Sequence, residues 1–273
     1  TTFLTHHICI WMDTMDKRDK RKKRVLQLGI FLLLGTILCL KYRNFFFGNV
    51  SKLAMLLHID WSYRDQLIFL PIGISFYTLS AIGYMTDVYW GKVKAEYSLV
   101  KTALFLGFFP IIVEGPICRW EDVESTLFKN ESVKAENVFK GCYRIIWGLF
   151  KKMIIADRLA VLVDKVYVGY ESYSGAVIVA AAISYTIQLY MEFSGCMDMV
   201  IGSAGLFGIR LPENFSQPFF AKTCTDFWKR WHITLGVWFK NYIFYPVSIS
   251  KTARKWNKFT RKHFKGDFGK YVA

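Results

Sequence analysis

The sequence predicts an all-α, polytopic integral membrane protein, and two observations lead to that fold class. Hydrophobic residues make up 53% of the 273 residues and aromatic residues 18%, whereas charged residues make up 21%, below the roughly 25% typical of soluble domains. The apolar residues form blocks long enough to cross a bilayer, and the charges lie between the blocks. We therefore expect one membrane-embedded domain over residues 1–273.

In the first half of the chain, three apolar blocks are expected to be membrane segments: residues 25–40, 67–90 and 99–113. A spanning helix needs about 20 residues, so the first block is expected to extend toward the aromatic residues 45–47. The second block ends at Trp90, a residue type that is enriched at membrane interfaces. The third ends near Pro110, which favours a tilted span or a re-entrant segment.

The second half contains two further apolar blocks and two mixed segments, namely residues 175–193, 196–209, 138–168 and 223–247. The first mixed segment is expected to span at its start and to lie flat on the membrane surface, as an amphipathic helix, over residues 151–167. Gly202, Gly205 and Gly208 favour close helix packing. The second mixed segment, residues 223–247, is predicted to be a single helix rich in aromatic and cationic residues. The chain is thus expected to contain roughly five to seven membrane segments.

Basic residues gather in two clusters, residues 17–24 and 251–270, and the 36 lysines and arginines exceed the 21 acidic residues to give a formal charge of +15. The first cluster adjoins the apolar block that begins at Val25. This pattern is typical of cytoplasmic segments beside anionic lipid, whereas a nucleic-acid-binding protein gathers its cations on one polar surface. The expected partner of these clusters is the lipid bilayer, with no nucleic acid.

Reporter fusions test the topology that these clusters predict. The positive-inside rule places both clusters in the cytoplasm, with an even number of full crossings between them. A reporter active only in the cytoplasm is expected to work when fused within either cluster. A reporter that works in one cluster and fails in the other would place the two clusters on opposite sides of the membrane and contradict the topology.

The motifs of metal and nucleotide sites are missing from the sequence. The six cysteines stand singly without a CxxC pair, and no P-loop, HExxH, nucleophile elbow or dinucleotide-binding fingerprint is present. We therefore expect no metal and no tightly bound cofactor.

His232 is the histidine that stands in a strongly patterned segment. On a helical wheel of residues 226–240, the aromatic side chains form one arc with His232 at its edge, while Asp226 and Arg230 lie opposite at the favourable i,i+4 spacing. A neutral imidazole beside a cavity accepts a proton from a hydroxyl, as in general-base acyl transfer. The alternative is a core or interfacial histidine that only fills space and makes one hydrogen bond.

Acidic residues inside apolar blocks give a second signal. Glu192 and Asp198 flank the sequence Phe193-Ser194-Gly195, and Glu114 precedes a glycine–proline turn. An acidic side chain at the bilayer centre costs about 2.5–3.5 kcal/mol on insertion scales, so such groups usually face a cavity or a partner. One interpretation is a polar substrate pocket. The other places them at the membrane interface, where the cost nearly vanishes.

Four motifs follow one another along the chain. They are residues 70–78 (LPIGISFYT) with 87–89 (DVY), residues 114–119 (EGPICR), residues 193–202 (FSGCMDMVIG) with 211–215 (LPENF), and residues 226–235 (DFWKRWHITL). In this order they resemble the membrane-bound O-acyltransferase family, and most closely its bacterial alginate O-acetyltransferase branch. The resemblance extends from about Tyr42 to Tyr245, and the last two motifs are the most specific.

The resemblance implies a multi-pass protein of the cell membrane, in a bacterial inner or plasma membrane. Its transmembrane and re-entrant helices would form a horseshoe around a tunnel. The implied donor is an acyl-CoA, in particular acetyl-CoA, or an acyl carrier protein on the cytoplasmic side. The implied acceptor is a hydroxyl of an extracytoplasmic glycan or of a partner acetyltransferase.

The resemblance also assigns residues. It makes His232 the catalytic candidate, which lines the tunnel or assists the base. The tunnel or pocket candidates are Asp198, Glu192, Asn214, Trp231, Trp228 and Arg230. The family has a second functional histidine in a later GLWHG-like span. We expect this chain to be truncated at both ends, and to be inactive alone because it lacks that second histidine.

The chain departs from the family pattern at three places. Glu114 stands where the family has a small residue, Cys196 replaces an aromatic residue, and residues 246–250 (PVSIS) replace a glycine-rich stretch. Three other functions stay open. They are a D-alanyl transfer protein of teichoic-acid modification with a carrier-protein donor, a membrane transporter, and a non-catalytic scaffold. A transporter would show inverted repeats and repeated intramembrane charges, and the sequence contains neither.

Overall fold

A computed structural model describes residues 1–16, 19–64, 71–129 and 132–263, with residues 261–263 described by their backbone alone. Within these residues the regular structure is helical, apart from one isolated β-bridge between Phe215 and Trp231, which confirms the all-α class. The chain divides into two compact units, Thr1–Asn214 and Phe215–Ala273. The prediction of a single membrane-embedded domain stays a prediction.

Two helices are long and apolar enough to cross a membrane, among the residues that are described. They are α2 (Lys20–Lys41) and α10 (Gly175–Leu206). Helix α2 corresponds to the predicted block 25–40, and its N-terminal turns hold part of the first basic cluster. Residues 17 and 18 of that cluster lie outside the described residues, as do residues 264–270 of the second. The larger number of spans and the horseshoe remain predictions.

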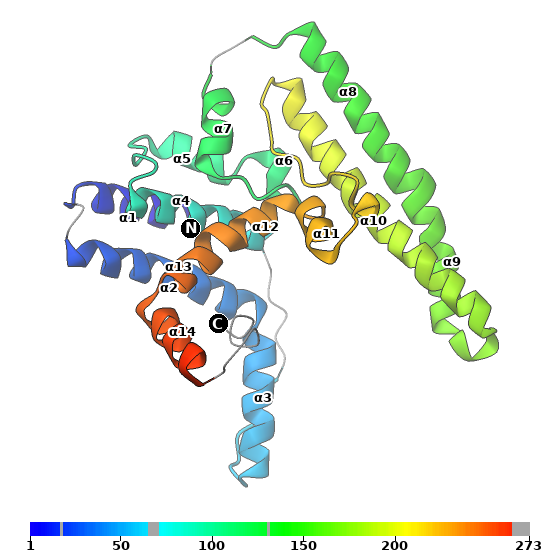
Figure 1. The fold of residues 1–273 in the computed structure, drawn as a ribbon, viewed down its shortest axis with the longest axis horizontal. Helices are drawn as coiled ribbons and strands as arrows, with labels where there is room; N and C mark the ends of the chain where they lie inside the picture. The colour runs from blue at the N-terminus through cyan, green and yellow to red at the C-terminus, as the bar shows by residue number, and fades with distance from the viewer. Residues whose placement is uncertain (17–18, 65–70, 130–131, 264–273) are drawn as a thin grey trace. The chain divides into compact units, whose positions relative to one another are not determined.

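The N-terminal helices pack side by side, as Figure 1 shows for α1 (Thr2–Asp13), α2 and α4 (Ile74–Trp90). Helix α1 falls outside the predicted segments because it is too short to span a bilayer. Its Cys9 and Met12 are completely buried against these neighbours. A separate helix, α3 (Arg43–Leu56), follows α2, so the aromatic residues 45–47 do not extend the first block.

Helix α4 begins later than the predicted segment 67–90. Residues 67–70 lie outside the described residues, and residues 71–73 form a turn. Gly73 has a left-handed backbone (φ 72°), and a Cβ there would lie 1.6 Å from the carbonyl oxygen of Ile112. Only glycine fits at this close approach. The prediction of one uninterrupted helix was therefore wrong at its start.

The predicted segment 99–113 is two short helices, α5 (Leu99–Leu106) and α6 (Phe109–Ile112), which are followed by α7 (Trp120–Leu127). Pro110 lies in the first turn of α6, where its missing N–H has no helical partner to lose. The rings of Tyr84, Phe105 and Trp120 pack together, with Tyr84 stacked on Trp120 at 4.8 Å between centroids. This aromatic core ties α4, α5 and α7 to one another.

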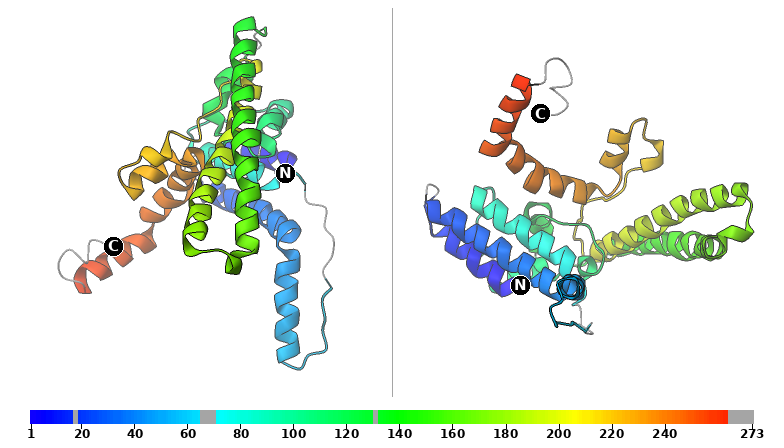
Figure 2. Two further views of the ribbon diagram at one scale, coloured as in Figure 1. Left: turned by 90° about the vertical axis from the view of Figure 1, so that its right-hand side faces the viewer. Right: turned by 90° about the horizontal axis from the view of Figure 1, so that it is seen from below.

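A long helical hairpin forms the rest of the first unit. One arm runs through α8 (Ala135–Leu149), the π-helical turns η1 (Phe150–Ala156) and α9 (Asp157–Val168), and the other arm is the 32-residue α10. Figures 1 and 2 show the two arms lying along each other, joined by a turn that includes η2 (Tyr170–Ser172). Two predictions were therefore wrong. Residues 175–193 and 196–209 are not separate segments, and residues 151–167 pack along α10.

Glycines at two crossing points explain why the arms approach so closely. A Cβ at Gly202 would lie 2.8 Å from the carbonyl oxygen of Gly141, and a Cβ at Gly195 would lie 2.8 Å from that of Gly148. These four glycines let the two backbones touch. The packing predicted for Gly202 is confirmed, whereas Gly208 lies beyond the end of α10.

The second unit is built from short helices: η3 (Pro218–Phe220), α11 (Cys224–Arg230), α12 (Ile233–Phe239), η4 (Lys240–Phe244), α13 (Tyr245–Ser248) and α14 (Lys251–His263). The sequence predicts one helix over residues 223–247. That prediction was wrong, because the chain leaves the helical conformation at Trp231 and His232.

Candidate functional site

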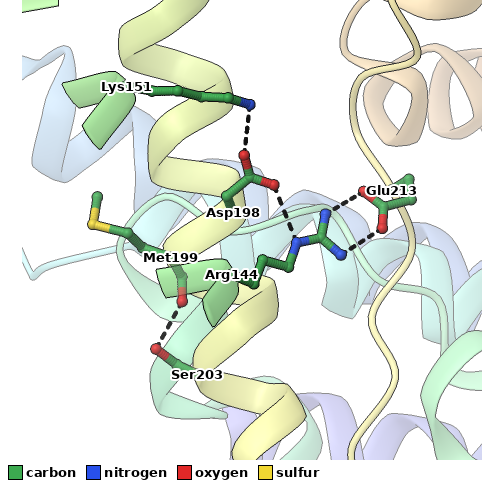
Figure 3. Close-up of polar contacts among 6 residues, drawn as sticks. All are labelled: Arg144, Lys151, Asp198, Met199, Ser203 and Glu213. Atoms are coloured by element: carbon green, nitrogen blue, oxygen red, sulfur yellow. Dashed lines mark hydrogen bonds and ion pairs between the residues drawn. The ribbon is translucent and has the colours of Figure 1, made fainter. Parts of the chain in front are cut away.

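Asp198 is the centre of an ion-pair network on the hairpin (Figure 3). Its Oδ2 accepts a hydrogen bond from Lys151 Nζ at 2.6 Å, and its Oδ1 accepts one from Arg144 Nε at 3.1 Å. The two terminal nitrogens of Arg144 donate to the two carboxylate oxygens of Glu213 at 2.7 and 2.6 Å. This fork-to-fork geometry is the strongest arrangement that an arginine makes with a carboxylate.

The network links four segments of the chain and balances its own charge. Two cations from α8 and η1 meet one carboxylate from α10 and one from the loop that follows α10. The side chains of Asp198 and Lys151 are 13% and 15% exposed, whereas Glu213 is 56% exposed. Asp198 therefore faces the helix interface and has partners there, as ionised groups in apolar surroundings require.

Glu192 lies one turn and a half earlier on α10 and is more exposed. Its carboxylate accepts a hydrogen bond from Lys152 at 2.6 Å, and the same ammonium group binds Asp157 at 2.7 Å. The stretch of α10 before Glu192 carries no charge and is about 26 Å long at 1.5 Å per residue. That length approaches the hydrocarbon thickness of about 30 Å, so the acids of α10 begin where the apolar stretch ends.

A cleft of about 350 Å³ lies beside the network, between the first turns of α8 and the C-terminal end of α10. Four charged side chains contribute to its lining: Lys140, Arg144, Arg210 and Glu213. Backbone surface is also exposed in it, at Gly141, Gly202, Gly205 and Gly208. Its volume falls within the range of small-molecule sites.

The loop after α10 is anchored to the hairpin by two adjacent residues. Glu213 binds Arg144, and Asn214 is 1% exposed with its side-chain amide donating to Met197 Sδ at 3.1 Å. The pocket candidate Asn214 is thus a fixed structural point at the end of the first unit.

In the second unit, His232 follows a residue held in an extended conformation. Trp231 forms a β-bridge with Phe215, and the backbone N–H of Ser216 donates to the Arg230 carbonyl at 3.0 Å. This pairing stops α11 before Trp231. The helical wheel over residues 226–240 was therefore wrong, because tertiary pairing with Phe215 overrides the local helical pattern.

His232 itself has a left-handed backbone, with φ 47° and ψ 53°, and it precedes the first residue of α12. This conformation costs an ordinary side chain roughly 1–2 kcal/mol and persists only where the surroundings enforce it. The side chain is half-buried, and burial lowers the pKa of its imidazole below the ordinary value of 6.5. The imidazole is therefore neutral at pH 7 and able to accept a proton.

Aromatic rings hold this segment in place. Trp231 stacks on Phe227 at 5.6 Å between centroids and meets the edge of Phe215 at 5.1 Å. Trp228, by contrast, is 61% exposed. The ion pair predicted between Asp226 and Arg230 is confirmed, at 3.0 Å.

Comparison with known proteins identifies the family. The family model described as the membrane-bound O-acyltransferase family matches residues 92–261, which include the ion-pair network, the cleft and His232. The chain belongs to the membrane-bound O-acyltransferase family. This confirms the resemblance seen in the motifs.

Relatives in this family carry several names. The chain is 36% identical over 227 residues to a probable alginate O-acetylase of Pseudomonas aeruginosa, covering 83% of this chain and 43% of the relative. It is 32% identical to a peptidoglycan O-acetyltransferase of Helicobacter pylori (83% and 47%) and 30% identical to a teichoic acid D-alanyltransferase of Bacillus subtilis (68% and 48%). The chain thus spans less than half the length of these relatives.

Two of the positions where the chain departs from the family motifs lie next to each other. The Glu114 carboxylate lies beside the thiol of Cys196, although the two belong to different motifs. The two motifs therefore meet at the contact between α10 and the turn after α6.

The partners of the acidic residues were not predicted from the sequence. In the sequence, Arg144 and Lys151 are charged residues within the mixed segment 138–168, and Glu213 belongs to the motif 211–215. None of the three was predicted to join an ion-pair network with Asp198. The signal was present, because a cation in an apolar helix needs a counter-charge. In the part of the chain that is described, no group of three or more His, Cys, Asp or Glu side chains is arranged to hold a metal ion.

Proposed function

We propose that the protein transfers an acyl group, acetyl in the first instance, from a cytoplasmic thioester to a hydroxyl outside the cytoplasm. The donor is an acyl-CoA or an acyl carrier protein that is not tightly bound, and the acceptor is a polysaccharide or a partner protein. Membership of the membrane-bound O-acyltransferase family carries this proposal. The alginate and peptidoglycan O-acetylating enzymes among its relatives support an extracytoplasmic glycan acceptor.

In the proposed reaction His232 handles a proton. The neutral imidazole accepts the proton of the acceptor hydroxyl as its oxygen forms a bond to the thioester carbonyl carbon. The carbon–sulfur bond then breaks, and the leaving thiolate takes that proton from the imidazolium, which returns His232 to its neutral form. The network around Asp198 has a positioning role, because it fixes the loop of Glu213 and Asn214 on the hairpin.

Complementation tests this function. The complete gene is expressed in bacteria that make an acceptor polysaccharide but lack their own O-acetyltransferase, and base-labile acyl esters on the polysaccharide are measured. We expect acetyl esters to appear with the gene and to be absent with the empty vector. Equal ester content in both strains would reject the proposal.

D-alanyl transfer is the second candidate, and the identity to teichoic acid D-alanyltransferases favours it. The mass of the acyl group released by mild base separates the two functions. Released D-alanine in place of acetate would establish the second candidate.

A further inference from the structure

The cleft beside the ion-pair network carries positive charge that the network does not neutralise. Arg144 is held by Asp198 and Glu213. Among the residues that the structure describes, Lys140 pairs with Glu136 alone, and both side chains are more than 70% exposed, so that pair neutralises little. The side chain of Arg210 makes no ion pair with any residue that the structure describes. Arg210 and Lys140 therefore remain available to an anionic ligand.

Gly205 shows that the cleft is a feature separate from helix packing. A Cβ at Gly202 would lie 2.8 Å from backbone of α8, so glycine is required there by the helix contact. A Cβ at Gly205 would meet nothing nearer than Gly141 Cα at 3.9 Å, which is ordinary contact distance. Helix contact therefore does not require glycine at 205. What its missing side chain provides is open space in the cleft, which Gly205 lines.

The cleft lies at the open end of the hairpin, away from the turn that joins its two arms. Beyond Asp198, helix α10 ends at Leu206, and the facing turns of α8 carry Asn137 and Lys140. The charged and polar side chains at this end suit a water-soluble ligand. The guanidinium fork of Arg210 and the ammonium group of Lys140 suit phosphate oxygens.

We propose that this cleft binds the phosphate-bearing end of the acyl donor, with Arg210 and Lys140 as its cationic contacts and Gly205 keeping it open. The inference rests on the proposed function. Coenzyme A and the phosphopantetheine arm of a carrier protein share this phosphate chemistry. The cleft therefore determines donor affinity and leaves the acyl-transfer step to other groups.

The kinetic test compares donors with and without phosphate. The full-length protein is reconstituted in phosphatidylcholine nanodiscs and assayed with acetyl-CoA, an acetylated carrier protein and acetyl-N-acetylcysteamine, a thioester that carries no phosphate. We expect Arg210→Gln and Gly205→Leu to raise KM for the phosphate-bearing donor by about 10-fold or more, with kcat preserved. Transfer from acetyl-N-acetylcysteamine is expected to be unchanged.

Two matched controls accompany these variants. Lys165→Gln removes an exposed cation on α9, and Gly35→Leu places a side chain in open space on α2. Both are expected to keep the parent KM. Equal losses with and without phosphate on the donor would mean that the cleft variants damage the fold, and unchanged KM in both would mean that the cleft does not bind donor. Either result overturns the inference.

A binding measurement separates this inference from the proposed function. Desulfo-CoA, which cannot be acylated, and the unacylated carrier protein are titrated into the same nanodiscs by calorimetry. Binding that weakens with Arg210→Gln supports the cleft even if no thioester supports transfer, a result that would reject only the proposed function. Binding of neither probe, or equal binding to parent and variant, overturns the cleft.

Discussion

Replacing His232 by alanine is expected to lower O-acyl transfer by about 10²–10⁴-fold in the complete protein, with normal amounts of protein in the membrane. We expect this loss because the imidazole is half-buried and neutral at pH 7, and because the left-handed backbone of His232 fixes its position. The readout is acyl esters formed per unit of membrane protein. Unchanged transfer would make His232 a packing residue.

His58→Ala is the matched control for this variant. His58 has the same left-handed backbone (φ 55°), but its side chain is exposed and lies outside the motifs. A comparable loss in His58→Ala would indicate a general effect of removing a strained histidine. Donor affinity in His232→Ala then separates two roles: weak binding places His232 along the donor path, and intact binding with slow turnover places it in the proton transfer.

Acidification offers a second check on His232. Because burial lowers its pKa, the imidazole stays neutral as the pH falls through the ordinary value of 6.5. Transfer that depends on the neutral form is therefore expected to persist at pH 6.5 and to fall only at lower pH.

Replacing Arg144 by glutamine is expected to destabilise the hairpin strongly. The variant leaves Glu213 without a cation and Asp198 with Lys151 alone. Breaking a fully buried pair costs about 3–5 kcal/mol, and partial exposure of this network places the loss below that range. The measurement is the Tm of the purified protein in detergent.

Two further variants make this prediction specific. Arg158→Gln removes an exposed arginine of the same hairpin and is expected to keep the parent Tm. Glu213→Gln removes the carboxylate that Arg144 holds, so the double variant should lose less than the two single losses added together. Strict additivity, or an Arg144→Gln protein as stable as Arg158→Gln, would contradict the network.

The positions of the apolar helices could be predicted from composition, but their breaks could not. Block 25–40 is recognisable as α2 because its length and charge boundary are local properties. The continuity of α10 through Gly195 could not be predicted, because it depends on the backbone of Gly148 in another helix. The break at His232 depends in the same way on Phe215, which lies well before it in the chain.

The candidate residues could be picked out from the sequence, whereas their partners could not, and the functional roles of the candidates stay predictions. Single unusual residues such as Asp198 and His232 stand out in an apolar or aromatic context. The groups that position them, among them Arg144 and Glu213, come from distant segments, so that only the fold brings them together. The cleft could not be predicted from the sequence, since Gly202, Gly205 and Gly208, which line it, indicated only helix packing.

The central claim is that this chain belongs to a protein that carries an acyl group from a cytoplasmic thioester to a hydroxyl across the membrane. Inside-out membrane vesicles that contain the complete protein and enclosed acceptor glycan, supplied from outside with a thioester labelled in its acyl group, test it most directly. We expect base-labile label on the glycan inside the vesicles, dependent on the protein and lost in His232→Ala. Label that appears equally in vesicles without the protein, or not at all with any thioester donor, would contradict it.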